Sequence, residues 1–258
     1  MKKTILINDA RSNAAKSINK YLLEEFGLDE NYDVLFNVFH QKLYHVHQTK
    51  KPDIVVWAIS EYTQEIHDYI VEFSSTVKII LLVDTPITQN DLIQFLNQSN
   101  VNIILDTNTK YEFTNPIATY SKLYEDSLFF DQKKDKNNKT LILLSKDNDK
   151  NLEVINLPKE IEQVCNVVAI GNPDYESNIN LGLFNYAELG DILSNFSTVV
   201  DIDNNYNLEC QACGVPSALI DKDFDITNIT TFNPEIEDIE KYTYKNFVTN
   251  NIIPFIRK

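Results

Sequence analysis

The sequence contains only three cysteines, no long apolar run, and few basic residues relative to its acidic content. Cys165, Cys210 and Cys213 cannot all pair with one another, so no disulfide framework is expected. Lys2 and Lys3 precede only about five apolar residues, which is too short for a secretory signal. These features favour a reducing cytoplasm. No segment approaches the roughly 20 apolar residues that a membrane-spanning helix needs, so we expect no transmembrane segment.

The shortage of basic residues also limits the partners. Aspartate and glutamate number 38 against 23 lysines and arginines, which gives a formal net charge of -15. That charge repels phosphate backbones and anionic lipids, so neither nucleic acid nor a membrane surface is an expected partner. Hydrophobic residues make up 43% of the 258 residues, including 13 tyrosines and 14 phenylalanines. A chain of this size can bury a sizeable core and suits one large or two small domains.

The first part of the chain alternates short apolar runs with amphipathic segments. This alternation predicts a parallel sheet flanked by helices. The predicted strands span residues 4–8, 33–39, 53–59, 77–83 and 101–105, and the predicted helices span 10–25, 61–73 and 88–96.

A polar segment divides the chain in two. Residues 131–139 contain no apolar side chain, and a new strand is predicted immediately afterwards at 140–145. We therefore expect two α/β domains, residues 1–132 and 133–258. The second half repeats the alternation, with strands predicted at 140–145, 167–170, 181–184, 198–202 and 217–220 and helices at 186–195 and 208–213. Residues 234–258 contain many apolar side chains and should pack as helix.

The most informative segment is 197–220, which has the pattern strand, loop, short helix, Gly-Val-Pro turn, strand. Gly214 should end the helix, and Pro216 prevents it from continuing. Glu209 opens this helix after the carboxyl end of a predicted parallel strand. Ligands of open α/β sheets bind outside such ends. Glu209 therefore either faces a bound group or is solvated at a helix start, where carboxylates are favoured in any case.

Four segments of the second half resemble, in order, the carboxyl-terminal domain of GT-B glycosyltransferases. They are LILLSKDNDK at 141–150, VVAIGNP at 167–173, LGLFNYAELGDILSNF at 181–196 and LECQACGVPSALI at 208–220. The similarity is to the large retaining group that uses nucleotide-activated sugars, and it covers roughly the distal third of the chain. It implies an α/β fold of two Rossmann-like domains in a GT-B-like arrangement.

The resemblance also implies residue roles. Glu209 matches the glutamate that binds the nucleotide ribose, which is reasonable because a carboxylate accepts strong hydrogen bonds from two hydroxyls. Lys146 and Lys150 are the nearest matches to the basic pair that neutralises the diphosphate, although each could equally be a solvated loop lysine. Asp201 has the spacing of the family's second acidic residue, eight positions before Glu209, and is a candidate catalytic residue that would serve, as Asp9 could, as an acid or acceptor contact. The remaining expected contacts are Gly171, Asn172 and Asn205 at the donor and Asp9 as an acid or acceptor contact.

The implied function is transfer of a sugar from a nucleotide-sugar donor to a glycan or protein acceptor, without a metal or other cofactor. An alternative is a non-catalytic GT-B-like subunit that binds a partner glycosyltransferase or its substrate protein. The family usually has two glycines between its acidic residues, where this chain has Ile202 and Asn204. The missing glycines, the short chain and the strong acidity support the alternative.

Other residue groups point to weaker possibilities. A phosphoacceptor receiver domain is excluded because its aspartate would fall at Ala58 and no lysine follows the strand at 101–105. His40, His45 and His47 are expected to be exposed side chains and not metal ligands.

The two nearby cysteines and the acidic tract also have simple explanations. Cys210 and Cys213 should pack their helix onto the sheet because no second cysteine pair exists. The acidic tract at 221–240 is either a solvated surface or a docking surface for a basic partner.

Overall fold

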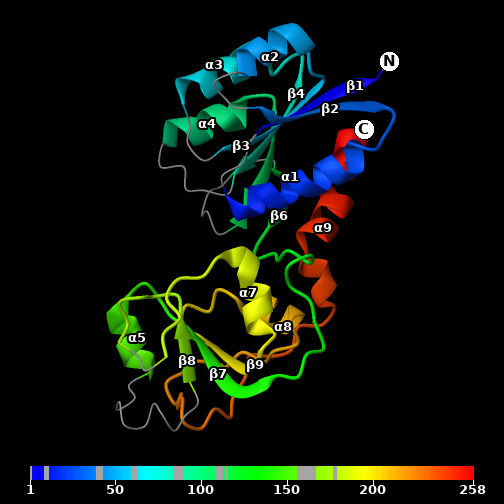
Figure 1. The fold of residues 1–258 in the computed structure, drawn as a ribbon. Coiled ribbons are helices and arrows are strands. Elements are labelled where there is room, and N and C mark those ends of the chain that lie inside the picture. The colour runs from blue at the N-terminus through cyan, green and yellow to red at the C-terminus, as the bar shows by residue number, and fades with distance from the viewer. Residues whose placement is uncertain are drawn as a thin grey trace. The chain divides into compact units, whose positions relative to one another are not determined.

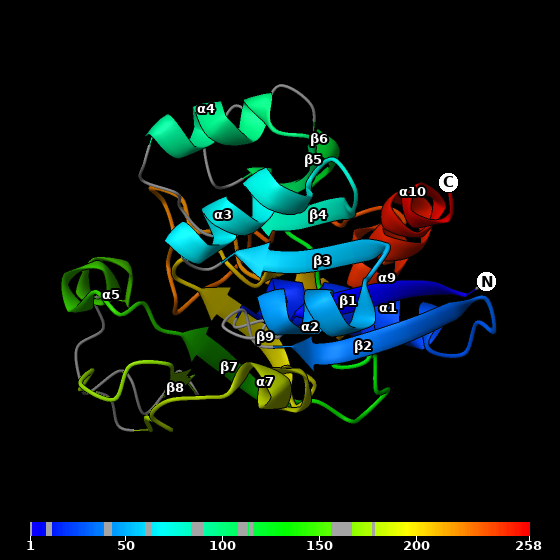
Figure 2. The same cartoon turned by 90° about the horizontal axis from the view of Figure 1, so that it is seen from above.

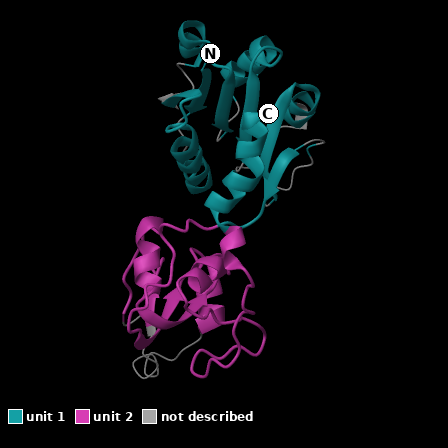
Figure 3. Ribbon diagram, turned by 90° about the vertical axis from the view of Figure 1, so that its right-hand side faces the viewer, with its two compact units in different colours: residues 1–123, 243–258 teal, residues 124–242 magenta. Residues whose placement is uncertain are grey.

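The structure is a computed structural model that describes residues 2–8, 12–38, 43–59, 63–83, 90–107, 113, 116–155, 167–176 and 179–258. The chain forms two compact units (Figure 3): unit 1 contains Met1–Leu123 and Thr243–Lys258, and unit 2 contains Tyr124–Tyr242. The division therefore lies before the predicted boundary at 132/133, and the end of the chain belongs to unit 1. Among the described residues, no helix is both long and apolar enough to span a bilayer.

Unit 1 is built on a six-stranded sheet with the order β2-β1-β3-β4-β5-β6, in which every neighbouring pair is parallel. The strands are β1 (Lys3–Asn8), β2 (Tyr32–Val38), β3 (Ile54–Ile59), β4 (Lys78–Val83), β5 (Val101–Asp106) and β6 (Pro116–Tyr120). In the described parts of the connections lie the helices α1 (Asn13–Phe26), α2 (Leu43–Lys50), α3 (Gln64–Phe73) and α4 (Asn90–Gln98). Figure 2 shows the strand order, and Figure 1 shows α2, α3 and α4 on one side of the sheet and α1 on the other. The predicted parallel sheet is confirmed, and β6 is an additional strand that the sequence did not predict.

Successive side chains of the unit 1 strands point to opposite faces of the sheet and pack in two separate hydrophobic clusters. Ile5 and Ile7 pack with α1, whereas Leu6 packs on the opposite side with α2, α3 and α4. The helices therefore lie on both faces of the sheet, as expected when apolar strands are buried on both sides.

The carboxyl-terminal segment completes the α1 side of unit 1. It forms α9 (Tyr244–Phe247), the π-helical turn η4 (Val248–Ile252) and α10 (Ile253–Arg257). Phe247 packs against Tyr120 with ring centroids 5.2 Å apart, and the Arg257 guanidinium lies 2.6 Å from the Glu25 carboxylate. The predicted helical packing of this segment is confirmed, but its apolar side chains cover unit 1 and not the second domain.

Unit 2 contains a three-stranded parallel sheet of order β8-β7-β9. Its strands are β7 (Asn137–Leu143), β8 (Val167–Ile170) and β9 (Phe196–Asp201). The helices in the described part of this unit are α5 (Asn148–Ile155), α7 (Tyr186–Leu193), α8 (Asn207–Ala212) and the short η3 (Ile239–Tyr242). Predicted strands at 181–184 and 217–220 are wrong as full strands. In their place single parallel bridges occur, Ala169 with Asn180 and Val199 with Ser217.

The helices α7 and α8 pack on one face of the unit 2 sheet. Cys210 and Cys213 are free and fully buried there, which confirms their predicted packing role; Cys165 lies outside the described residues. Gly190 in α7 lies against the backbone of Leu128, where a Cβ would be only 2.0 Å from the Leu128 carbonyl oxygen. The segment that begins unit 2 is therefore held tightly against α7.

Candidate functional site

The carboxyl ends of β7, β8 and β9 bring most of the predicted site residues to one edge of unit 2. Ser145 follows the end of β7 and is bound by the buried side chain of Asn151 in α5. The Asn151 amide accepts a 2.8 Å hydrogen bond from the Ser145 N–H and donates to the Ser145 carbonyl at 2.9 Å. Asn172, after β8, donates to the same carbonyl and to the Asn148 side chain, both at 2.9 Å. Asn172 is 5% exposed. Its amide therefore joins two loops of the edge.

Gly171 allows these two loops to approach each other. Its φ of 110° lies in the region that favours glycine. A Cβ at this position would lie 3.1 Å from the Leu144 carbonyl oxygen and 3.3 Å from the Phe184 ring. The Gly171 N–H donates to the Gly182 carbonyl at 2.6 Å, so residue 171 needs glycine for the local chain path.

Asp201 ends β9 and closes the loop that leads to α8. Its side chain is 5% exposed, and Oδ2 accepts the Tyr206 N–H at 2.5 Å. Burial raises the pKa of Asp201, while hydrogen bonds from the backbone of Tyr206, Asn205 and Asp203 act in the opposite direction. The Asp201 carboxylate is therefore bound by the backbone of the loop that follows it, which stabilises that loop.

The predicted cations differ in their surroundings. Lys150, at α5, places Nζ 2.5 Å from Asp203 Oδ1 in a half-buried ion pair. Lys146 and Asn205 are exposed. The structure thus brings Lys150 and Asp203 together, which the sequence did not predict. Asp9 lies outside the described residues.

Glu209 lies in the first turn of α8 and is 6% exposed. Its Oε1 accepts a hydrogen bond of 3.0 Å from the Tyr186 hydroxyl, which belongs to the first residue of α7. Solvation of Glu209 at a helix start is therefore excluded, because the carboxylate is buried between two helix beginnings.

Tyr186 belongs to an aromatic cluster with Tyr206 and Phe184, which the sequence did not predict. The Tyr206 ring lies 5.9 Å from Phe184 and 6.5 Å from Tyr186, measured between centroids. Burial raises the pKa of Tyr206, and the negative charges of Asp201 and Glu209 add to this effect. The alternation of Phe184 and Tyr186 before a helix is the only sequence signal that could have indicated this cluster.

The charge of the chain is concentrated in unit 2. This unit has 23 acidic and 9 basic side chains, a net charge of -14, whereas unit 1 has 15 and 14, a net charge of -1. Among the described residues, no group of three or more His, Cys, Asp or Glu side chains could hold a metal ion. The edge is thus acidic without forming a metal centre within the described part of the chain.

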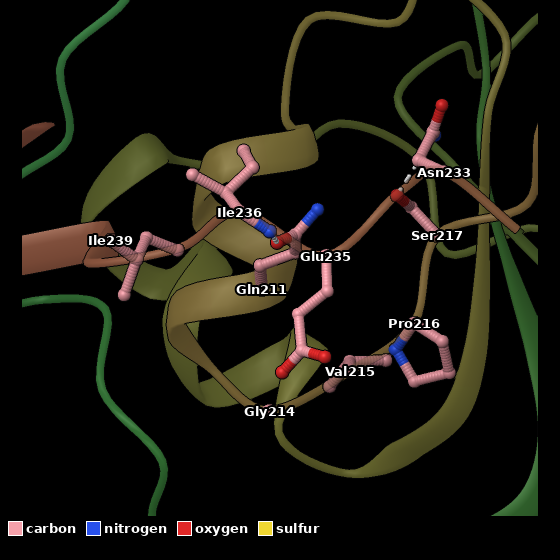
Figure 4. A pocket seen from close by; sticks show the side chains of 9 residues that line it. All are labelled: Gln211, Gly214, Val215, Pro216, Ser217, Asn233, Glu235, Ile236 and Ile239. Atoms are coloured by element: carbon pink, nitrogen blue, oxygen red, sulfur yellow. Dashed lines mark hydrogen bonds between the residues drawn. The ribbon is translucent and has the colours of Figure 1, made fainter.

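A separate cavity of about 360 Å³ lies beside the carboxyl end of α8 (Figure 4). None of the residues predicted to bind a donor lines it. The cavity is therefore distinct from the carboxyl edge of the sheet.

The chain was compared with known proteins at the levels of sequence and structure. No protein-family model matches it, and no curated protein matches its sequence. A solved structure assigned as a UDP-N-acetylglucosamine 2-epimerase of Listeria monocytogenes is similar, with a TM-score of 0.52 and 12% identity over 96% of this chain and 87% of that chain. A second UDP-N-acetylglucosamine 2-epimerase has a TM-score of 0.53 and 11% identity over 88% of this chain and 81% of that one. The chain has a GT-B-like fold.

The GT-B-like fold confirms the predicted fold class of two Rossmann-like α/β units. At such low identity the similarity establishes the fold alone. The assigned roles of Glu209, Lys146, Lys150 and Asp201 remain predictions, as do the donor contacts of Gly171, Asn172 and Asn205.

Proposed function

We propose that unit 2 binds a nucleotide sugar at the carboxyl edge of its sheet, and that the protein transfers the sugar to a glycan or protein acceptor. The carrying observation is the position of Glu209: a buried carboxylate in the first turn of the helix that follows β9, beside the Tyr186 hydroxyl. Ligands of open α/β sheets bind at this edge. The similar solved structures are named as enzymes of a UDP-sugar, which supports this class of donor.

In this proposal Glu209 accepts hydrogen bonds from the ribose hydroxyls, and the half-buried rings of Phe184 and Tyr206 provide an apolar surface for the base. The turn at Gly171, which packs closely against Leu144 and Phe184, would border the donor and fix the position of Asn172. Asn172 and Asn205 would contribute at the border of the site, and Asp201 would act by holding the loop that carries them.

The transfer breaks the bond between the anomeric carbon and the diphosphate oxygen and forms a bond from that carbon to an acceptor oxygen. The acceptor hydroxyl loses its proton to water, and the diphosphate leaves with additional negative charge. Lys150 and Lys146 would stabilise that charge, which is electrostatic catalysis. Lys150 must first leave Asp203, which lies 2.5 Å away. The nucleotide sugar is a substrate of this scheme, which includes no cofactor. The buried free thiols of Cys210 and Cys213 are consistent with a reducing cytoplasm.

The binding step is tested by thermal melting and calorimetry with UDP, UDP-N-acetylglucosamine, UDP-glucose and the corresponding GDP compounds. A ligand at 100 times its Kd stabilises the native state by about 2.7 kcal/mol, so the true donor should raise Tm. Glu209→Ala should weaken binding about tenfold or more. Glu188→Ala is the matched control, because Glu188 has the same position in α7 but is exposed.

The ion pair provides a second arm of the same test. Asp203→Asn removes the partner of Lys150, and should therefore strengthen binding of a nucleoside diphosphate, while Lys150→Met should weaken it. The binding proposal is wrong if no nucleotide shifts the melt, or if the Glu209 and Glu188 variants lose affinity equally. Transfer itself is measured by mass spectrometry of acceptor glycans and peptides incubated with the bound donor.

Two observations favour the alternative of a non-catalytic GT-B-like subunit. Unit 2 has a net charge of -14, which opposes an anionic donor, and its Lys150 is already paired with an acidic side chain. Such a subunit would bind a partner glycosyltransferase or a substrate protein. Co-purification of a glycosyltransferase with the full chain, together with an absence of nucleotide binding, would support this alternative over the transferase.

A further inference from the structure

The cavity beside α8 is formed by two segments that are distant in sequence. Gln211, Gly214, Val215, Pro216 and Ser217 line it from the end of α8 and the following turn, and Asn233, Glu235, Ile236 and Ile239 line it from the acidic tract. Its volume of about 360 Å³ lies within the range of roughly 300–1,000 Å³ of pockets that bind small groups. Figure 4 shows Ile236 and Ile239 on one side, Pro216 on the other, and the Glu235 carboxylate directed toward the Gly214–Val215 turn. We refer to it as the Glu235 pocket.

The uncharged polar side chains of this pocket already bond to the protein. Gln211 donates to the Pro234 carbonyl at 2.9 Å and accepts the Ile236 N–H at 2.7 Å. Asn233 donates to the Ser217 hydroxyl at 3.0 Å, and Ser217 donates to Asn207 at 2.6 Å. These bonds hold the tract against α8 and give the pocket a fixed shape. They leave Glu235 as the lining residue that selects the charge of an occupant.

Glu235 is exposed at the rim, and within the described part of the chain its carboxylate has no hydrogen bond or ion pair. Asp131 and Lys136 do not line the pocket but contact the same turn: the Asp131 carboxylate lies within 3.4 Å of a Cβ placed on Gly214, and the Lys136 ammonium donates to the Gly214 carbonyl. The charged side chain that lines the pocket is therefore a carboxylate, in a unit whose own net charge is -14.

We propose that the Glu235 pocket docks a segment of a partner protein that carries a basic side chain beside apolar ones. The aliphatic stem of an arginine or lysine would pack on Ile236, Ile239 and Pro216, and its charged end would pair with Glu235. The negative charge of unit 2 would attract such a segment during encounter and repel acidic ones. This binding site is independent of the donor edge and does not require the proposed glycosyl transfer.

The test uses the full chain without nucleotide and measures binding by fluorescence polarisation. The probe is a labelled peptide with one arginine flanked by leucines, and its reference peptide has citrulline, which is isosteric but neutral, in place of arginine. Glu235→Gln should weaken binding of the arginine peptide about fivefold, and Ile239→Ala about tenfold. Glu237→Gln is the matched control, since Glu237 is also exposed but does not line the pocket.

Three results together support the site. Wild-type protein should prefer the arginine peptide to the citrulline peptide, the Glu235→Gln protein should bind both equally, and Glu237→Gln should change the affinity by less than about twofold. An unchanged Tm of the Glu235 variant shows that its fold is intact. The proposal is overturned if the two glutamate variants weaken binding equally, if citrulline binds as well as arginine to the wild type, or if neither peptide binds.

Discussion

Asp201 should act as a structural residue of the loop between β9 and α8, and its removal should destabilise unit 2. The side chain is 5% exposed, and Oδ2 accepts the Tyr206 N–H at 2.5 Å. The backbone N–H groups of Asp203 and Asn205 also favour the ionised form of this carboxyl group and lower its pKa. Asp201→Ala would leave the Tyr206 N–H without its acceptor inside the folded loop.

The expected magnitude follows from two opposing terms. A hydrogen bond to a charged group is worth about 1.5–3 kcal/mol, and an unsatisfied buried donor costs about 1–3 kcal/mol. Against this, burial raises the pKa of Asp201, so the ionised carboxylate is itself unfavourable and its removal recovers part of the loss. We therefore expect Asp201→Ala to lower the free energy of unfolding by about 2–4 kcal/mol. Asp201→Asn keeps one acceptor oxygen and should lose less.

The pH dependence has a definite sign. Because the folded pKa of Asp201 is raised above 3.8, the folded state binds more protons than the unfolded state in the interval between the two values. Its stabilising contribution is therefore complete below 3.8 and is lost as the pH rises through the folded pKa. Asparagine does not titrate, so the stability of Asp201→Asn relative to the wild type should increase across this interval.

Urea unfolding followed by far-UV circular dichroism measures these differences. Trp57 is the single tryptophan and lies in β3 of unit 1, so its fluorescence provides an internal control for the other unit. A loss below about 0.5 kcal/mol for Asp201→Ala would refute the structural role of Asp201 in this loop. A pH-independent difference between wild type and Asp201→Asn would refute the raised pKa.

Two further predictions concern the packing of Gly190 and the titration of His47. Gly190→Ala should destabilise unit 2 by about 3 kcal/mol, because the new Cβ would lie 2.0 Å from the Leu128 carbonyl oxygen. Gly182→Ala is the control: no atom lies within 4 Å of its Cβ position, but φ is 77°, so this variant should lose only about 1–2 kcal/mol. Equal losses for the two variants in urea unfolding would contradict the close contact at Gly190. In unit 1, His47 Nδ1 lies 2.8 Å from the Tyr69 hydroxyl, and burial lowers the pKa of His47 below 6.5. Its contribution to stability should therefore be complete above 6.5 and be lost as the pH falls through the lowered folded value, so that His47→Gln melts with a flatter acid dependence by Trp57 fluorescence. Parallel melting curves for the two proteins would show that His47 does not titrate in this way.

The sequence predicts the strands of both sheets best where apolar runs are buried on both faces. The runs around Ile5, Val56 and Ile142 are such cases, and the corresponding strands β1, β3 and β7 form as expected. Pro116–Tyr120 starts with proline and contains exposed Thr119, so this edge strand has no comparable signal. The segments at 181–184 and 217–220 have strand-like composition, but whether they pair continuously depends on neighbours that are distant in sequence.

The unit boundary shows why polarity alone misplaced the division. Residues 131–139 are polar because they are largely exposed, yet β7 begins within them at Asn137. The preceding side chains of Tyr124 and Phe129 are buried in the core of unit 2. The loop and the exposed start of β7 therefore have the polar composition of a linker between domains. The division between the units is determined instead by the apolar side chains of residues 124–130, which pack in unit 2.

The candidate site shows the same separation between local and distant information. The order of strands and helices was enough to place Glu209, Asp201 and Gly171 at one edge, since the carboxyl ends of parallel strands meet there. Their partners could not be inferred, because Tyr186 is 23 residues from Glu209 and Asp203 is 53 residues from Lys150. The ion pair of Lys150 and Asp203 distinguishes the two proposed functions. In the proposed transfer the donor diphosphate would replace Asp203 at Lys150 within an acidic unit, whereas a non-catalytic subunit would keep the ion pair intact.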